Sequence, residues 1–122
     1  MMTTIPQGSG CQRGDVALVL FPDSNLRTAK LRPVLVVQAD DLGTGLPQLI
    51  VAMITANTLR AGHASRVTVL RATAEGRRSG LLTDSVMMTD NLATISDTEI
   101  DRVVGSLPMG KVEAALRHTL AL

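Results

Sequence analysis

An arginine stands directly before a run of apolar residues in the segment TAKLRPVLVVQADD. Arg32 is followed by Pro33 to Val37 with no polar residue between them. Proline lacks a backbone N–H and marks the first residue of a strand or an edge, so we expect Arg32 where a loop enters a buried strand. A guanidinium keeps its charge and offers a fork of donors that fits phosphate oxygens. The position suits either a rim arginine paired with Asp40 or Asp41, or an arginine that binds phosphate.

The other reactive residue types form no catalytic or metal-binding pattern. His63 and His118 are far apart and Cys11 is the single cysteine, so neither a zinc site nor an internal disulfide is predicted. Asp40 and Asp41 lie in a glycine-rich segment, where a solvated turn is the better interpretation. The P-loop, G-x-G-x-x-G and G-x-S-x-G motifs are missing from the sequence. We therefore expect no metal and no cofactor, and find no support for nucleotide hydrolysis, hydride transfer or serine-type acyl transfer.

The charges are distributed unevenly although the net charge is only +1. Residues 1–80 contain nine Lys or Arg against five Asp or Glu, whereas residues 81–122 contain three against six. The stretch from Arg60 to Arg78 holds five arginines and one acidic residue. Such segregation favours an anionic partner, including nucleic acid. Phe21 is the only aromatic residue, so bases cannot be held on an aromatic stacking platform.

Cleavage of RNA is one reaction that a small, metal-free, basic protein can catalyse, because RNA carries its own nucleophile, the 2′-hydroxyl. The reaction needs a base for that proton, an acid for the departing 5′ oxygen, and positive charge at the phosphorane. Arg32 has the chemistry that the third role requires.

Short apolar runs separated by turn residues predict a mainly β fold. The C-terminal segment Lys111–Leu122 has apolar residues at helical spacing and predicts an amphipathic helix that packs on the rest. Closely spaced strands without crossover helices favour a small, strongly curved antiparallel barrel over a parallel sheet. The five predicted strands are Asp15–Phe21, Arg32–Gln38, Gln48–Thr55, Arg66–Leu70 and Ser85–Thr89.

The connecting segments carry their own signals. Pro22–Lys30 is predicted as a loop, and Glu75–Gly80 as a turn, from their Pro, Gly, Ser and Asn content. Ser96 and Glu99 have the spacing of a capping box and predict the start of a short helical turn. Ile100–Pro108 is compatible with either helix or strand.

The length of 122 residues suits a single domain. Residues 1–11 are polar and rich in glycine, and we expect a disordered lead-in before one domain over residues 12–122. That lead-in lacks the basic and apolar regions of a signal peptide. The longest clean apolar run, Leu49–Ile54, is far too short to span a membrane. We therefore expect a cytoplasmic protein with no membrane partner.

Five sequence blocks together resemble one known family. The chain is similar to the MazF/PemK toxins of bacterial toxin–antitoxin systems over residues 12–122, with the blocks in the same order. The blocks are RGDVALVLFP (Arg13–Pro22), RPVLVVQ (Arg32–Gln38), VAMIT (Val51–Thr55), DSVMMTDNLATI (Asp84–Ile95) and IDRVVGSLP (Ile100–Pro108).

The resemblance implies a fold, an activity and partners. The family has a small SH3-like antiparallel barrel, also found in CcdB toxins, and acts as homodimers. Its members are metal-independent, sequence-selective endoribonucleases that cut single-stranded RNA, mostly mRNA. The cuts leave a 2′,3′-cyclic phosphate and a 5′-hydroxyl. A cognate antitoxin blocks the enzyme by placing a C-terminal segment in the RNA groove. We therefore expect single-stranded RNA, an antitoxin and a second copy of the chain as partners.

The resemblance also implies site residues. Arg32 matches the family arginine that contacts the scissile phosphate, and Thr55 matches the threonine that closes the AxxT strand. Asp90 falls at the acidic position proposed as general base in the PemK branch. A neutral hydroxyl is a poor base, so Thr55 suits a hydrogen bond to phosphate better than proton transfer. The residues assigned to RNA binding are Arg27, Lys30, Asn57, Arg60 and Asn91.

The chain departs from the family pattern in its first loop and at Met88. The loop PDSNLRTAKL has neither the glycines nor the Glu or His that many relatives carry there, so cleavage specificity does not transfer. Met88 stands where the PemK branch has an arginine, which leaves more of the charge stabilisation to Arg32. Two alternatives are a CcdB-like gyrase poison, disfavoured because the chain has no tryptophan, and a catalytically silent barrel that binds RNA or antitoxin.

Overall fold

The computed structural model describes residues 10–122, so most of the predicted lead-in, residues 1–9, lies outside the described residues. Six strands, two α-helices and two 3-10 turns follow one another along the described chain. Their order is β1 (Asp15–Pro22), β2 (Ala29–Val36), β3 (Gln48–Thr55), η1 (Thr58–Arg60), β4 (Arg66–Val69), α1 (Ala74–Ser79), β5 (Ser85–Ser96), η2 (Asp97–Glu99), β6 (Ile100–Ser106) and α2 (Gly110–Leu120).

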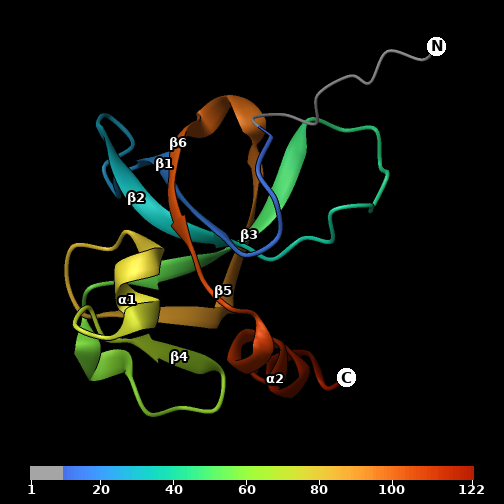
Figure 1. The fold of residues 1–122 in the computed structure, drawn as a ribbon. Coiled ribbons are helices and arrows are strands. Elements are labelled where there is room, and N and C mark those ends of the chain that lie inside the picture. Colours follow the sequence, from blue (N-terminus) through green and yellow to red (C-terminus); the bar gives the residue numbers. More distant parts are fainter. Residues whose placement is uncertain (1–9) are drawn as a thin grey trace.

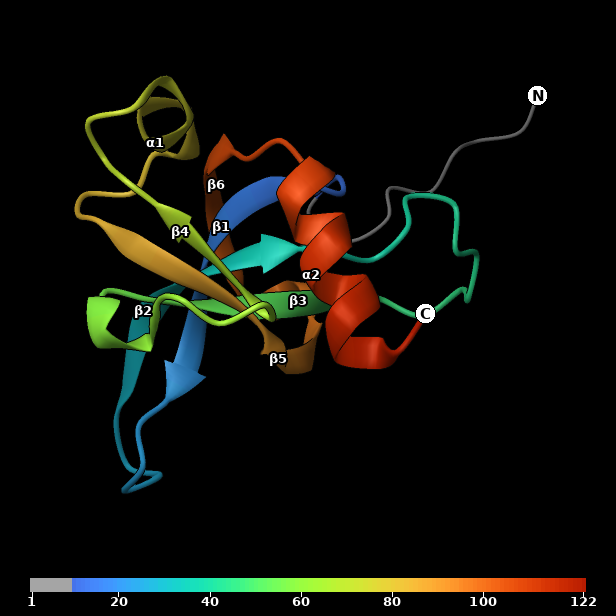
Figure 2. The ribbon, with the colours of Figure 1, turned by 90° about the horizontal axis from the view of Figure 1, so that it is seen from below.

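All six strands belong to one antiparallel sheet, in the order β4-β5-β3-β2-β1-β6. The sheet coils strongly, so that β1, β6 and the second half of β5 curve around one another (Figure 1). The predicted mainly β fold with a C-terminal helix is confirmed. Figure 2 shows the β1–β2 hairpin extending away from the body of the protein, on a different side from α2.

The central strands are buried on both faces, which explains their uninterrupted apolar sequences. Neighbouring residues of β1 and β2 alternate between two hydrophobic clusters. Val16 and Leu35 belong to a cluster that α2 covers through Val112, whereas Ala17, Val34 and Val36 belong to a second cluster closed by Ile95. Because each face has its own core, β1, β2 and β3 form a rigid platform.

The β2 strand begins three residues earlier than the sequence predicted. The hairpin closes with the Asp23 N–H donating to the Thr28 carbonyl at 2.8 Å, and pairing continues from Ala29. Pro33 therefore lies inside the strand rather than at its first residue. From Ala29 to Pro33, β2 pairs with β1 alone, and β3 joins only at Val34. Pro33 thus lies in a part of β2 that is an edge on one side. An edge was the second of the two positions that the sequence analysis expected for this proline.

The β5 strand is much longer than predicted, since it runs past Thr89 to Ser96. Its pairing with β3 jumps from Met53–Met88 to Ala52–Leu92. The extra residues form a bulge, which lets one strand continue around the bend of the sheet. Ser96 and Glu99 form the predicted capping box, and the ambiguous segment that follows is strand β6.

The predicted turn at Glu75–Gly80 is instead the short helix α1, with Thr73 as its N-cap and Gly80 in a left-handed conformation after its end. The glycine inside this helix serves close packing. A Cβ on Gly76 would lie 2.0 Å from the Leu70 carbonyl oxygen, and one on Gly105 of β6 would lie 2.2 Å from the Arg78 carbonyl oxygen. The segment Glu75–Gly80 has the composition of a turn because close backbone contacts exclude side chains at its two glycines.

The α2 helix confirms the predicted C-terminal helix. Val112 and Ala115 are buried on its inner face, and the helix packs against β4 and β5 (Figure 2). None of the helices in residues 10–122 has the length and apolarity needed to cross a membrane.

Candidate active site

The pairing of β2 with β3 brings Arg32 and Thr55 together. The paired register ends at Val34–Met53. Continued by two residues, the same register sets Pro33 across from Ile54 and Arg32 across from Thr55. Residues opposite each other on neighbouring strands are in reach of one another. Strand register therefore brings two residues that lie 23 positions apart in the sequence to the same end of the β2–β3 pair.

Both residues line the same cavity, which has a volume of about 540 Å³. Arg32 is half-buried, with 44% of its side chain exposed. The Thr55 hydroxyl accepts a hydrogen bond from the Asn57 N–H at 3.1 Å, which orients the oxygen and leaves its proton free to donate. The lining consists of Leu18, Leu31, Arg32, Pro33, Ile54, Thr55, Ala56, Gly80, Leu81, Leu82, Thr83, Ser85, Arg102 and Val104.

Arg102 is a second arginine in this cavity that the sequence analysis did not select. It lies on β6 and pairs with Leu18, which pairs on its other side with Pro33. Its guanidinium contacts the neighbouring Asp101 carboxylate. Arg102 comes from the acidic C-terminal part of the chain, and only the order of the strands brings it to the cavity that Arg32 lines.

Asp23 binds the guanidinium of Arg32, and the sequence analysis missed it as well. Arg32 Nη2 donates to Asp23 Oδ1 at 3.0 Å, and the Thr28 hydroxyl donates to Asp23 Oδ2 at 2.6 Å. The hydrogen bond from Thr28 and the nearby charges of Lys30 and Arg32 lower the pKa of Asp23. The one available signal was an aspartate in the turn-forming PDSN segment of the loop before Arg32.

The structure does not bring Asp90 to this cavity within one chain. Ser85 of β5 lines the cavity, and Asp90 is five residues further along the strand, about 17 Å at about 3.3 Å per residue. Asp90 lies in the β5 bulge and accepts two hydrogen bonds from Arg66, at 2.8 and 3.4 Å. These bonds lower the pKa of Asp90 and raise that of Arg66. A lowered pKa also makes Asp90 a weaker base.

The residues assigned to RNA binding are all exposed, and none of them lines the cavity. Arg27 and Lys30 belong to the β1–β2 hairpin, whereas Asn57 caps η1 through its side chain. Arg60 ends η1, and its carbonyl accepts from Arg66 at 2.9 Å. The remaining assigned residue, Asn91, follows Asp90 in the β5 bulge.

Metal-binding and titratable groups add little to this cavity. Among residues 10–122, no three His, Cys, Asp or Glu side chains gather as a metal site would require. The residues that line the cavity in the described chain include no carboxylate and no imidazole. What the arrangement offers is two guanidinium groups and a hydroxyl donor, which suits a group that carries or develops negative charge.

Comparison with known proteins identifies the family of this chain. Residues 12–120 match the family described as PemK-like, MazF-like toxin of type II toxin-antitoxin system. Endoribonuclease MazF6 of Mycobacterium tuberculosis is 35% identical over 107 residues, covering 84% of this chain and 90% of the relative. Endoribonuclease EndoA of Bacillus subtilis is 33% identical over 115 residues, covering 91% of this chain and 95% of the relative.

Solved structures show the same fold. A mycobacterial endoribonuclease in complex with its cognate antitoxin aligns with a TM-score of 0.70 at 19% identity, covering 92% of this chain and 96% of that chain. The Mycobacterium tuberculosis toxin MazF-mt6 aligns with a TM-score of 0.66 at 24% identity, covering 88% and 97%. Sequence match and fold agree, and the chain belongs to the PemK-like, MazF-like family of toxins from type II toxin–antitoxin systems.

Proposed function

We propose that this chain is an endoribonuclease that cuts single-stranded RNA without a metal ion, with the scissile phosphate bound between Arg32 and Thr55. The observation that carries the proposal is that these two residues, from different strands, line one cavity. The relatives that share the family are named endoribonucleases. The same pair of residues favours cleavage over a gyrase-poisoning role, because an arginine and a threonine suit the binding of a phosphate group rather than of a protein.

In this mechanism the substrate provides the nucleophile. The 2′ oxygen forms a bond to phosphorus, the bond from phosphorus to the 5′ oxygen breaks, and the products are a 2′,3′-cyclic phosphate and a 5′-hydroxyl. Arg32 stabilises the charge that develops on the non-bridging oxygens, and Thr55 donates a hydrogen bond to the same group. Arg102 adds a second positive charge at the wall of the cavity.

Proton transfer follows from the composition of the cavity. With no carboxylate or imidazole among its described lining residues, water accepts the proton of the 2′-hydroxyl and supplies one to the 5′ oxygen. Asp23 acts through Arg32, whose guanidinium it holds in place, and is therefore a positioning residue. In this form of the proposal, Asp90 supports the structure through Arg66 rather than serving as the general base.

The proposal includes control by a cognate antitoxin and assembly into a homodimer in the cytoplasm. Relatives of the same fold have been solved with an antitoxin bound, which supports the first part. Exposed leucines such as Leu20 and Leu31, at 49% and 45% exposure, offer apolar surface for a second copy. Sedimentation at micromolar concentration checks the dimer, and a strictly monomeric protein would contradict it.

Digestion of a long, mostly unstructured RNA in excess EDTA tests the activity. Wild-type protein and Arg32→Ala are compared, with circular dichroism to verify folding and with mapped fragment ends. We expect discrete cuts that end in 2′,3′-cyclic phosphate for the wild type and loss of those cuts for Arg32→Ala. Equal cutting by both proteins would remove Arg32 from the mechanism. No cutting by folded wild type would favour the catalytically silent binding barrel.

A further inference from the structure

A second arginine-lined cavity adjoins the Arg32 cavity. It has a volume of about 810 Å³ and shares Gly80, Leu81, Leu82 and Thr83 with the first. The two hollows therefore adjoin at one short segment, Gly80–Thr83, which we call the ridge. The other residues that line the second cavity are Arg71, Ala72, Arg77 and Asp84.

The ridge is held firmly, so the two cavities keep a fixed relation. The Ser79 hydroxyl donates to the Gly76 carbonyl at 2.6 Å and accepts from the Leu81 N–H at 3.1 Å. A Cβ on Gly80 would lie 2.2 Å from the Val104 carbonyl oxygen, which shows how tightly the backbone packs on β6. Leu82 projects from this segment with 82% of its surface exposed.

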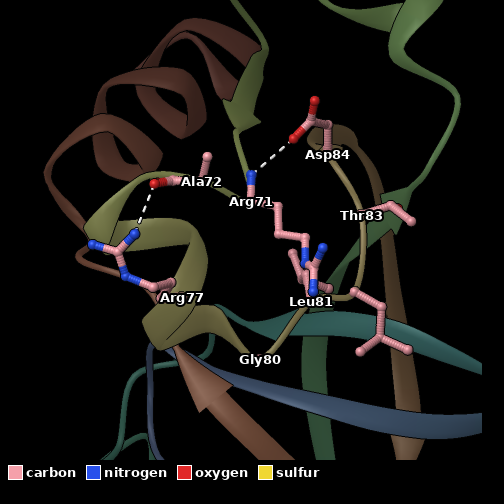
Figure 3. Close-up of a pocket in the computed structure, with 8 residues that line it drawn as sticks. Arg71, Ala72, Arg77, Gly80, Leu81, Thr83 and Asp84 are labelled. Carbon is pink, nitrogen blue, oxygen red and sulfur yellow. Dashed lines mark hydrogen bonds between the residues drawn. The ribbon is translucent and has the colours of Figure 1, made fainter.

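Arg71 is fixed at its backbone and free at its side chain. Its N–H donates to Asp84 Oδ1 at 2.8 Å, whereas within residues 10–122 its guanidinium takes part in no hydrogen bond or ion pair. Figure 3 shows the side chain extending along the cavity toward Leu81 on the ridge. Arg77 is also in this cavity, where Nη1 donates to the Ala72 carbonyl at 2.8 Å and its other donors remain available.

We propose that this second cavity binds a phosphate of the same RNA strand, next to the scissile phosphate, with Arg71 as its main ligand and Arg77 as a second one. The inference rests on the proposed function of the first cavity. An RNA strand that has its scissile phosphate at Arg32 can cross the ridge and meet Arg71 on the far side. Since the chain has no Tyr or Trp and a single Phe, such charge contacts must supply much of the affinity that stacking gives elsewhere.

Arg71→Gln tests this subsite, and Arg78→Gln is the matched control. Arg78 is an exposed arginine of α1, the helix that follows Arg71 and contains Arg77, but it lines a different hollow with Thr68 and Lys111. Both variants lose one positive charge, so a general effect of net charge would appear in both. Arg77→Gln is a third variant, for which we expect a smaller effect because its guanidinium is partly engaged.

The first measurement is binding of a 2′-O-methyl RNA oligonucleotide, which lacks the nucleophile and cannot be cut. We expect Arg71→Gln to raise Kd about tenfold at low salt. The slope of log K against log salt should fall by about 0.7, the value for one lost phosphate contact to a single strand. Equal Kd values for Arg71→Gln and Arg78→Gln would overturn the subsite, whether or not the wild type cuts RNA.

The second measurement is cleavage of two RNAs with the same cut site, one long and one trimmed to the nucleotides that immediately flank the cut. We expect Arg71→Gln to lower kcat/KM about tenfold on the long RNA and to leave the trimmed RNA unaffected. Equal losses on both RNAs would overturn the subsite, because Arg71 would then act at the scissile phosphate or through folding.

Unchanged RNA binding with weakened antitoxin binding would also overturn the subsite, and would assign the cavity to the antitoxin. If the wild type does not cut RNA, that result contradicts the proposed function only. Binding of the 2′-O-methyl RNA still tests the subsite in that case, because it does not depend on cleavage.

Discussion

Two arginine–aspartate pairs in different regions of the sheet differ in how many donors of the guanidinium group are engaged. Arg32 gives a single hydrogen bond to Asp23 at 3.0 Å, and 44% of its side chain is exposed beside the cavity. Arg66 gives two hydrogen bonds to Asp90 and a third to the Arg60 carbonyl, and only 24% of its side chain is exposed. A guanidinium carries five N–H donors, so Arg32 keeps most of its capacity for a ligand.

The difference separates an arginine that is available for a ligand from one that supports the fold. Arg66 links β4, the β5 bulge and η1. Its hydrogen bonds with Asp90 raise the pKa of Arg66 above the ordinary value of an arginine. Asp23 fixes the direction of the Arg32 guanidinium but accepts a hydrogen bond from only one of its donors. We therefore propose that the unused donors of Arg32, rather than the presence of an ion pair, mark it as the arginine of the two that binds a ligand.

Exchange of each arginine for lysine should give the largest contrast. Arg32→Lys keeps the charge but removes the planar fork, and we expect cleavage to fall about 10²- to 10³-fold with unchanged stability. Arg66→Lys should lower the unfolding midpoint and leave the rate of cleavage per folded molecule intact. Single-turnover RNA cleavage and urea unfolding measure the two effects. A catalytic loss in Arg66→Lys as large as that in Arg32→Lys would break the comparison.

Thr55→Val should have the next largest effect. Valine keeps the shape of threonine and removes the hydroxyl that the proposal places on the phosphate, so we expect kcat to fall about 10- to 100-fold. Thr55→Ser restores the hydroxyl and should recover most of the activity. Failure of serine to rescue would mean that Thr55 shapes the strand end rather than contacting phosphate.

Asp23→Ala should have a smaller effect, because Asp23 acts through Arg32. Loss of its hydrogen bond lets the Arg32 guanidinium move, and we expect kcat to fall about fivefold to tenfold, with about tenfold corresponding to 1.4 kcal/mol. KM should stay the same or decrease, since one negative charge leaves the surroundings of the bound phosphate. A large rise in KM at unchanged kcat would assign Asp23 to substrate binding instead.

Asp90→Asn should have the smallest effect and should appear in stability alone. We expect a loss of at most about 1 kcal/mol at pH 7, because both side chains of the pair are partly exposed. The folded-state pKa of Asp90 is lowered from 3.8, so this contribution is present above about pH 4 and disappears as the pH falls through the lowered pKa. Urea unfolding of both proteins at pH 7 and pH 3 measures the difference. Loss of cleavage in folded Asp90→Asn would restore Asp90 as the general base.

Local patterns in the sequence were sufficient for most of the secondary structure. The apolar runs of β1, β2 and β3, the capping box at Ser96 and the helical spacing of α2 depend on neighbours a few residues away. Their identification therefore needed no knowledge of the rest of the fold. Arg32 and Thr55 were also selected as site residues, each through the family motif that contains it, and their roles stay predictions.

Contacts between distant segments decided the rest, because no local pattern records them. The register of β2 on β3 brought Arg32 and Thr55 to one end of the strand pair, and the extra residues in β5 carried Asp90 away to Arg66. The α1 helix was hidden by Gly76, which is small because the Leu70 backbone lies against it. Strand order added Arg102 to the cavity, and hairpin closure added Asp23 behind Arg32. The sequence by itself thus determined which residues bring reactive groups, and the pairing of the strands determined which of those groups share a site.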